Sequence, residues 1–287
     1  MPVTVCRLVV LCAYLLALFP AAAAAEPAPA WGQAWHLSLQ GSIQQRADLA
    51  EHYQFTPTAA RLPGVPSGWE RKWNEQRAGV TLGYDLMASE HWLLQPRAGV
   101  GMSQAWFSAA NNPLGFSETW RSRPGLMWSV GAAAEARAGP QAGPFLRLGY
   151  DWRAAGMKEE SESIITQGPG GGAGNRDAAF RWQEQEISLM AGWRLGAWTP
   201  RLGVALIDWR LQKSLAYHIP ESEARTPPEL DLIRLLNSRK SQYQYHNGRA
   251  WAPRLGLGWS PLPGWSLELD CRLAADPEIG LGLTVSF

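Results

Sequence analysis

Beyond its first 25 residues the chain lacks long apolar runs, and it also lacks an excess of either charge. No later apolar run approaches the 18 residues of a helical membrane span, so such helices are excluded. Lys and Arg number 26 against 25 Asp and Glu, which gives a formal net charge of +1. A chain this close to neutrality offers no excess of positive charge for nucleic acid, and we expect no nucleic-acid partner.

The first residues have the organisation of a secretory signal peptide. Arg7 gives a positive start, residues 8–19 form a short apolar segment, and small residues lead up to Ala25, as a signal peptidase requires. We therefore expect three parts: a signal peptide at 1–25, a periplasmic linker at 26–33 and a folded domain at 34–287.

Cysteine is nearly absent from the exported part of the chain. Cys6 and Cys12 lie in the expected signal peptide, which leaves Cys271. One cysteine cannot form an internal disulfide, so the exported domain has to be stable without one.

What the sequence does have is alternation of apolar and polar residues. In residues 35–44 the odd positions are apolar or Gly and the even positions are polar. A period of two residues indicates β-strand. The pattern recurs and predicts ten strands, at about 35–44, 77–86, 92–103, 125–137, 145–153, 183–195, 200–211, 249–259, 265–273 and 279–287.

The predicted strand at 200–211 is the least regular of the ten. Leu206 shares a face with Asp208, whereas Trp209 and Leu211 fall on the opposite face. We expect a β-bulge here, because one extra residue would return Trp209 and Leu211 to the apolar side.

The connections between the predicted strands alternate in length. Short periplasmic turns and long extracellular loops are typical of outer-membrane barrels, and an even strand number places both chain ends in the periplasm. The sequence therefore predicts an all-β protein, a closed antiparallel transmembrane β-barrel. The short connections lie at 88–91, 138–144, 196–199 and 260–264, and the long polar ones lie at about 47–74, 106–123, 154–182 and 212–248.

Tryptophan is frequent, with 16 in the chain, and lies near both ends of the predicted strands. Indole rings settle at the two headgroup levels of a membrane because they combine an apolar body with one N–H donor. We predict two aromatic belts, one near the short turns with Trp35, Trp92, Trp198 and Trp265, and one near the long loops with Trp106, Trp152, Trp182, Trp209 and Trp251.

The polar faces of the strands predict the contents of the barrel. Backbone polar groups in hydrocarbon must all be paired, which a sheet achieves only by closing on itself. The polar faces then line the lumen, where buried charges have to be paired. We favour a lattice of paired charges that fills the lumen over an ion pathway lined by arginines. The predicted network comprises Arg77, Asp85, Arg97, Glu135, Arg137, Arg147, Asp151, Arg194, Arg254, Glu268, Asp270 and Arg272.

Ten strands, five outer loops and this length resemble the omptins, outer-membrane proteases whose site lies at the outer mouth of the barrel. Omptins use an Asp-x-Asp pair and an Asp-x-His pair that hold an attacking water. In this chain Ala216, Tyr217 and His218 stand where Asp-x-His is expected, and neither motif occurs in the sequence. The resemblance therefore implies the architecture without the catalytic residues. We interpret His218 as a loop residue, since alone it cannot act as an oriented base.

We identify no other catalytic or metal site from the sequence. His36 and Ser38 point inward on one strand, where filling the lumen is a simpler role than catalysis of the barrel-lipase kind. The five histidines show no ligand spacing, so we expect no metal and no cofactor.

The longest loop carries two further predictions. Leu230, Ile233 and Leu236 can line one side of a short helix across the barrel mouth. The tail at 239–246 mixes cations with aromatic residues, a combination that suits contact with lipopolysaccharide, although simple loop packing is the plainer interpretation.

We therefore predict a non-enzymatic barrel in the outer membrane of a Gram-negative bacterium, with a structural or surface-interaction role. The expected partners are membrane lipid, lipopolysaccharide, an unidentified protein, and the barrel-assembly machinery. The final strand, which ends in Phe287, resembles the segment that this machinery reads. Two alternatives stay open: a narrow passive channel or porin, and an omptin-like surface hydrolase with a different catalytic set.

Overall fold

The fold is described from a computed structural model of the chain. The expected signal peptide and linker lie outside the described residues. These residues are 34–47, 50–53, 69–89, 91–111, 116–139, 142–160, 164–165, 173–218, 220–224, 226–238, 240–273 and 277–287.

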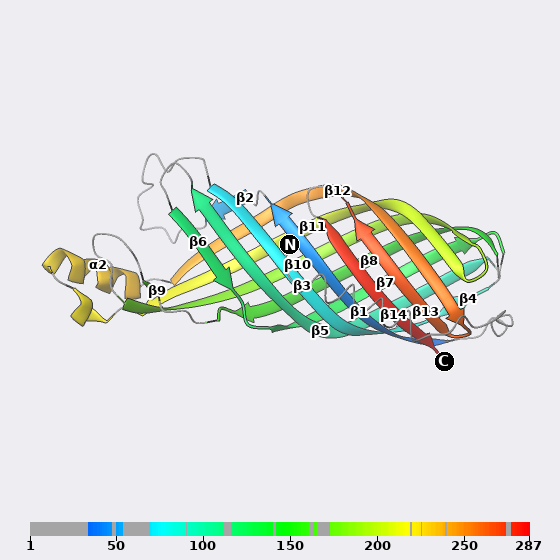
Figure 1. Ribbon diagram of the computed structural model, residues 1–287, viewed down its shortest axis with the longest axis horizontal. Helices are drawn as coiled ribbons and strands as arrows, with labels where there is room; N and C mark the ends of the chain where they lie inside the picture. Colours follow the sequence, from blue (N-terminus) through cyan, green and yellow to red (C-terminus); the bar gives the residue numbers. More distant parts are fainter. Residues whose placement is uncertain are drawn as a thin grey trace.

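Ten long antiparallel strands form a closed barrel (Figure 1). The first strand pairs with the last, and the backbone N–H of Trp35 donates to the carbonyl oxygen of Phe287 at 2.9 Å. This closure confirms the predicted fold and brings both ends of the barrel sequence to the end with the short turns. The ten strands are β1 (Trp35–Ala47), β3 (Trp69–Tyr84), β5 (Trp92–Asn111), β7 (Gly125–Arg137), β8 (Gly143–Lys158), β10 (Ala173–Arg194), β11 (Trp198–His218), β12 (Lys240–Leu262), β13 (Trp265–Arg272) and β14 (Glu278–Ser286).

Short strands and helices complete the described part of the chain. β2 (Ala50–Tyr53) pairs with β12, β4 (Met87–Ala88) and β6 (Phe116–Arg121) pair with β5, and β9 (Ile164–Ile165) pairs with β10. The 3-10 helix η2 (Glu221–Glu223) and the α-helix α2 (Pro227–Ser238) connect β11 to β12, and Figure 1 shows α2 at one tip of the molecule. Neither helix is long and apolar enough to cross a membrane.

The strands run farther outward than the sequence predicted. β5, β8 and β11 continue to Asn111, Lys158 and His218, so the segments predicted as loops are partly strand. Together with the starts of β10 and β12, these strand ends form the outer extension, on the left in Figure 1. The prediction was wrong because the apolar side chains of the outer extension point into the barrel, so an apolar face no longer marks the outside.

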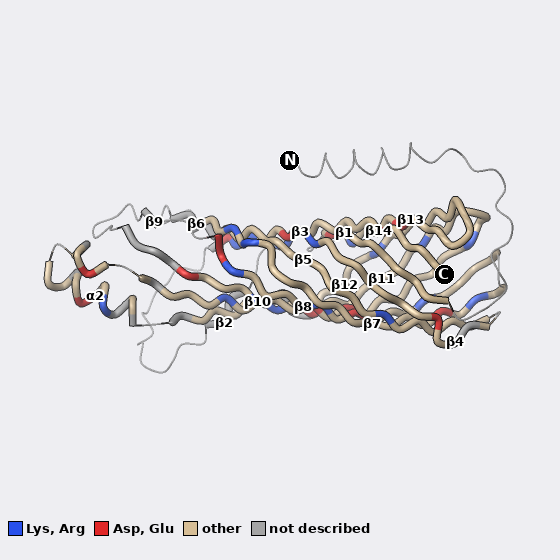
Figure 2. Tube along the Cα trace, turned by 90° about the horizontal axis from the view of Figure 1, so that it is seen from below, with Lys and Arg blue, Asp and Glu red and all other residues tan. Residues whose placement is uncertain are grey.

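Apolar side chains cover the outside of the barrel below the outer extension. Leu39, Met102 and Leu148 are 53%, 56% and 53% exposed, and similar residues occur on each neighbouring strand. A soluble protein rarely exposes so large a continuous apolar surface, whereas a membrane barrel turns it toward lipid. Positions of both charge signs follow the same strands in Figure 2. The ion pairs described below place many of these charges inside the barrel.

The tryptophans divide between the two faces of the wall. Trp106 and Trp152 share the outward face and are partly exposed. Trp182 and Trp209 were wrongly placed in a belt: they lie inside the barrel and are 2% and 0% exposed, because the lumen of the outer extension is apolar. Belts formed by the other tryptophans stay a prediction. Those that are well exposed are Trp35, Trp92, Trp198, Trp251 and Trp265.

The irregularity predicted in the strand at 200–211 is present as a register shift. Asp208 of β11 pairs with Arg249, and Arg210 pairs with His246, so the extra residue lies in β12. β11 therefore keeps its alternation, and Trp209 stays inside. The site of the bulge is confirmed, but its expected effect on Trp209 and Leu211 is wrong, since Leu211 is also only 1% exposed.

A glycine in β11 permits close approach of a neighbouring strand. A Cβ atom on Gly203 would lie 2.0 Å from the carbonyl oxygen of Leu189 and 2.8 Å from Met190 Cα. We expect Gly203→Ala to lower the free energy of unfolding by about 1–3 kcal/mol, because backbone atoms cannot move aside. Denaturant unfolding in detergent, read by heat-modifiable gel mobility, measures the change. In the control Gly41→Ala the new Cβ would be 3.7 Å from the nearest atom; equal stability of the two variants would contradict the argument.

Candidate functional site: the barrel lumen

Large apolar side chains close the outer end of the lumen. We call this cluster the aromatic plug: Trp73, Phe107, Trp120, Phe180, Trp182 and Trp209, each at most 2% exposed. The ring of Trp73 lies 5.9 Å from the rings of both Phe180 and Trp209, in the tilted geometry that aromatic pairs favour. The plug therefore fills the cross-section of the outer extension with packed apolar groups.

A layer of buried charges lies directly beneath the aromatic plug. We call Arg46, Glu75, Arg77 and Glu184 the outer charge layer; they are at most 6% exposed. Glu184 is paired with Arg46, and its Oε1 lies 3.3 Å from Arg77 Nη1. Glu75 lies 3.0 Å from Arg77 Nε and accepts a hydrogen bond of 2.5 Å from Ser103. Each charge in this layer is thus satisfied by its neighbours, as burial requires.

Cation–π contacts join the two layers. The guanidinium of Arg46 lies 4.5 Å from the ring centre of Trp209, and that of Arg77 lies 4.3 Å from the ring centre of Trp182. Desolvated contacts of this kind contribute about 2 kcal/mol. The aromatic plug and the outer charge layer therefore act as one seal.

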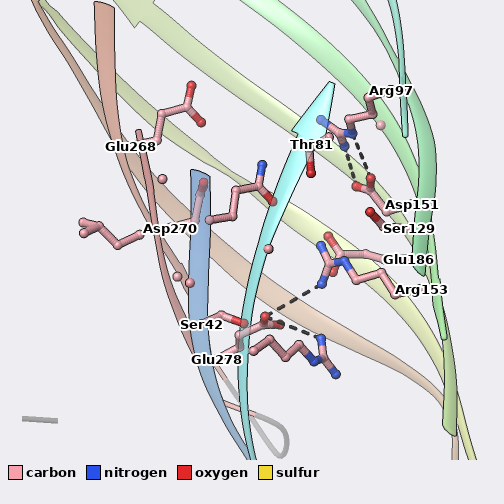
Figure 3. A pocket seen from close by; sticks show the side chains of 18 of the residues that line it. Ser42, Thr81, Arg97, Ser129, Asp151, Arg153, Glu186, Glu268, Asp270 and Glu278 are labelled. Carbon is pink, nitrogen blue, oxygen red and sulfur yellow. Dashed lines mark hydrogen bonds and ion pairs between the residues drawn. The ribbon is translucent and has the colours of Figure 1, made fainter. Parts of the chain in front are cut away.

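Below this seal the lumen contains a cavity of about 190 Å³ (Figure 3). Figure 3 shows Arg97 pairing with Asp151, and the Nε and Nη2 atoms of Arg97 donate to that carboxylate at 2.9 and 2.5 Å. On the opposite wall Arg201 lies 3.2 Å from Glu268 and 3.5 Å from Asp270. The cavity wall therefore carries both signs of charge, mostly in contact with each other.

The inner end of the lumen has its own ion pairs. Glu135 accepts a hydrogen bond of 2.8 Å from Arg137 and is also paired with Arg194. The Nε2 atom of His36 lies 2.8 Å from Asp85 Oδ1. These groups narrow the lumen near the short turns.

The structure places the twelve predicted charges inside the barrel, each with an oppositely charged or polar partner. Arg254 and Arg272 both pair with Glu186, the latter at 2.9 Å. Most of the twelve make an ion pair of 3.5 Å or less, and Arg147 is the exception treated below. The predicted charges therefore lie where they can pair with one another, and their role as a lattice that fills the lumen stays a prediction.

The predicted network nevertheless omitted central members, among them Glu184 and Glu186. Arg46 and Glu75 lie just beyond the ends predicted for their strands, and Glu278, which was assigned to the connection before the last strand, begins β14 and lies 3.0 Å from Arg272. The alternation contained the missing signal, because Arg46 continues the polar face of Gln40, Ser42 and Gln44.

Three carboxylates in the lumen lie close enough to hold a metal ion. Ligand atoms of Glu184, Glu186 and Glu278 all lie within 4.8 Å of one another. Arginines already occupy the space between them, including Arg272, which lies 3.7 Å from Glu184 and 2.9 Å from Glu186. This cluster is therefore compensated by the protein itself and does not call for a cation.

The structure corrects two interpretations in the fourth outer connection. His218 ends β11 instead of lying in a loop, and its Nε2 is 3.2 Å from Asp177 on the exposed outer face. The segment 239–246 was assigned to a loop but is mostly the start of β12, and its Tyr245 is 4% exposed inside the barrel; its contact with lipopolysaccharide stays a prediction. Both errors follow from the unexpected length of the outer extension.

The predicted helix is present as α2, which packs on β11, with Ile233 buried. Arg234 in α2 donates hydrogen bonds of 3.1 and 3.0 Å to Glu221, and these bonds hold the pKa of Glu221 below its ordinary value. The contact therefore persists at neutral pH and weakens as acidification protonates Glu221.

By its fold the chain is a ten-stranded transmembrane β-barrel. No protein-family model matches the sequence, and no curated protein matches it. Among solved structures, the transport unit of the autotransporter AIDA-I from Escherichia coli is 12% identical, with 96% of this chain and 97% of that chain covered and a TM-score of 0.41. The outer membrane protease OmpT from Escherichia coli is 10% identical, with 90% and 97% covered and a TM-score of 0.45.

The bidentate pair of Arg97 and Asp151 tests the importance of charge pairing. Arg97→Met leaves Asp151 without its hydrogen-bonded partner, and we expect it to lower the free energy of unfolding by about 2–3 kcal/mol, below the usual figure for buried pairs because Arg97 is 24% exposed. The double variant Arg97→Met/Asp151→Ala is expected to be more stable than Arg97→Met alone. Urea unfolding of the refolded proteins measures both, and a double variant less stable than either single one contradicts the prediction.

Proposed function

We propose that this chain is a non-conducting barrel in the outer membrane of a Gram-negative bacterium, with a structural or surface-interaction role. The observation that supports this proposal most directly is the seal formed by the aromatic plug and the outer charge layer. Trp73, Glu75 and Trp209 are each at most 1% exposed, which leaves no space for hydrated ions at that level. Passage of ions along the barrel axis is then not expected, and a surface-interaction role falls to the surfaces at the ends of the barrel.

The same observation weighs against the channel. A hydrated ion would have to displace packed aromatic rings and break the pairs of Glu184 with Arg46 and Arg77. Each of these steps removes a buried contact, and breaking a buried ion pair costs about 3–5 kcal/mol.

Lipopolysaccharide is the partner we propose for the outer extension. Arg123, Lys158 and Arg181 are exposed on its outer face, above the apolar band. Arg123 N–H donates to the Lys158 carbonyl at 2.8 Å, and β8 and β10 are paired strands, so these cations lie on neighbouring parts of one surface. Cationic side chains at this level suit the phosphate groups of lipopolysaccharide.

Assembly through the barrel-assembly machinery is proposed for the last strand. β14 pairs with β1 and β13, and Phe287 at its end is 70% exposed. An exposed aromatic residue at the end of the closing strand is available to a partner before the barrel closes.

Conductance measurements in planar bilayers test the seal. We expect the refolded protein to give no discrete current steps at high salt, whereas a porin reconstituted in the same way gives steps. Heat-modifiable mobility and protection from protease confirm that the inserted protein is folded. Reproducible current steps of one size would contradict the proposal and support the alternative function of a narrow channel.

A second candidate function, hydrolysis of esters, is favoured by one group of side chains at the inner end of the lumen. His36 Nδ1 lies 2.7 Å from Ser286 Oγ, and His36 Nε2 lies 2.8 Å from Asp85 Oδ1. Gln95 donates to the same Asp85 oxygen at 3.0 Å. A hydroxyl, an imidazole and a carboxylate in this order are the components of acyl transfer. The sequence analysis paired His36 with Ser38, whose hydroxyl instead contacts Thr284 at 2.7 Å.

In such a reaction Ser286 Oγ would attack the acyl carbon while its proton passes to His36 Nδ1. The alcohol would leave with that proton, and the Ser286 ester would then be hydrolysed by water in the reverse sequence. Asp85 would stabilise the charged form of the imidazole by proximity alone, since the contact between its Oδ1 and His36 Nε2 lacks hydrogen-bond geometry. The site would open toward the periplasm, unlike the outer mouth used by omptins.

A fluorophosphonate probe tests this candidate on the folded protein. We expect labelling of the wild type, a loss of at least about tenfold in Ser286→Ala and His36→Ala, and no loss in Ser38→Ala, because only Ser286 contacts the imidazole. Labelling that persists in Ser286→Ala, or a folded wild type that is not labelled, excludes the hydrolase.

A further inference from the structure

The cavity below the seal has a wall that is rich in arginine. Its lining includes Arg97, Arg147, Arg201 and Arg254, together with carboxylates that most of these arginines already contact. The ion pairs between arginines and carboxylates are therefore not uniform around the cavity. An arginine that lacks a close carboxylate marks a place where an anionic ligand could bind.

Arg147 in β8 is the main exception. Among the described residues its guanidinium makes one hydrogen bond, at 3.2 Å to the neutral Gln95 Oε1, and the nearest carboxylate oxygen is Glu135 Oε2 at 3.8 Å. Glu135 is itself held by closer contacts with Arg137 and Arg194. The Arg147 side chain is 23% exposed, so most of it has lost contact with bulk water. A largely desolvated charge of this kind is stabilised by a counter-ion in contact.

Arg201 in β11 supplies a second unsatisfied donor at the same cavity. Its Nη2 atom pairs with Glu268 and Asp270, but its Nε atom is buried with no acceptor among the described residues. The side chain is 10% exposed. A buried N–H group without an acceptor is destabilising, and a ligand oxygen would remove that penalty.

We propose that the cavity binds a small oxyanion, with Arg147 as its principal ligand and Arg201 as a second donor. Guanidinium groups bind the oxygens of phosphate and carboxylate groups through paired, charge-assisted hydrogen bonds. A cavity of about 190 Å³ accommodates an ion of this size together with a few water molecules.

The geometry favours a free ion over a lipid headgroup. The wall around the cavity is a continuous sheet, in which β7 pairs with β8, β8 with β10, and β10 with β11. A lipid tail cannot pass through paired strands, and the seal closes the outer end. The ion would therefore enter from the inner end, where it meets the partly exposed Arg194 and Arg147.

Isothermal titration of the refolded protein in detergent with inorganic phosphate tests this site, with chloride at the same ionic strength as the reference. We expect saturable binding by the wild type and a weakening of about tenfold or more in Arg147→Gln, because a charge-assisted contact is removed. Arg201→Gln is expected to weaken binding less. Arg210→Gln is the matched control, since Arg210 is 61% exposed on the outer face and pairs with Asp208.

Folding of each variant is checked by heat-modifiable mobility, and Arg147→Lys, which keeps the charge, is expected to restore part of the affinity. Binding that is the same in Arg147→Gln and wild type, or phosphate that acts no differently from chloride, overturns the proposal. The result is independent of conductance: a sealed barrel without phosphate binding refutes the oxyanion site alone, and a conducting barrel that binds phosphate refutes the seal alone.

Discussion

The structure depends on the need to pair every polar group that is removed from water. In the apolar band the backbone meets this need by closing the sheet, so that β1 bonds to β14 and no strand edge faces lipid. Closure then imposes the same need on the side chains, since a narrow barrel of ten strands leaves its polar faces little room for water. Arginine is well suited to this pairing because one planar guanidinium can donate two hydrogen bonds to a carboxylate on another strand, as Arg97 does to Asp151.

Side-chain size on the lumen wall follows from this pairing. Arg97 of β5 reaches Asp151 of β8 over Gly131 of β7, which pairs with both residues. A Cβ on Gly131 would lie 2.4 Å from Asp151 Oδ1 and 3.1 Å from Arg97 Nε, so a small residue is needed between the two partners. Glycine in these strands therefore provides the space that a neighbouring arginine side chain needs. In the outer extension the wall stands above the lipid, and the lumen can be filled by apolar packing. The aromatic plug is a core of the ordinary kind enclosed by a sheet, joined to the charged region by Arg46 and Arg77.

The sequence predicted the ten strands and the charged lumen because period two and face polarity are both local properties. The prediction failed in the outer extension, because apolar side chains face the lumen there and face lipid elsewhere. In β5 Met102 is apolar and faces out, whereas Phe107 is apolar and faces in. Both obey the same alternation, and the inversion between them marks the level at which the wall leaves the apolar band. An apolar side chain in a strand can face either lipid or an apolar lumen, and alternation does not distinguish the two. Trp209 was therefore assigned to the lipid side, although it belongs to the aromatic plug. Ion-pair partners such as Glu184 with Arg46, 138 residues apart, depend on the closed register and cannot be found from alternation.

The distribution of satisfied and unsatisfied groups separates structural from functional parts of the lumen. In the outer charge layer Glu184 contacts Arg46, Arg77 and Arg153, and Glu75 contacts Arg77 and Ser103. Every carboxylate of this layer therefore has a guanidinium group in contact. Toward the inner end the pairing is less complete at Arg147, which donates to a neutral amide and lies 3.8 Å from the nearest carboxylate oxygen. Incomplete pairing is destabilising unless something binds there, so the inner half of the lumen is where chemistry or binding should be sought.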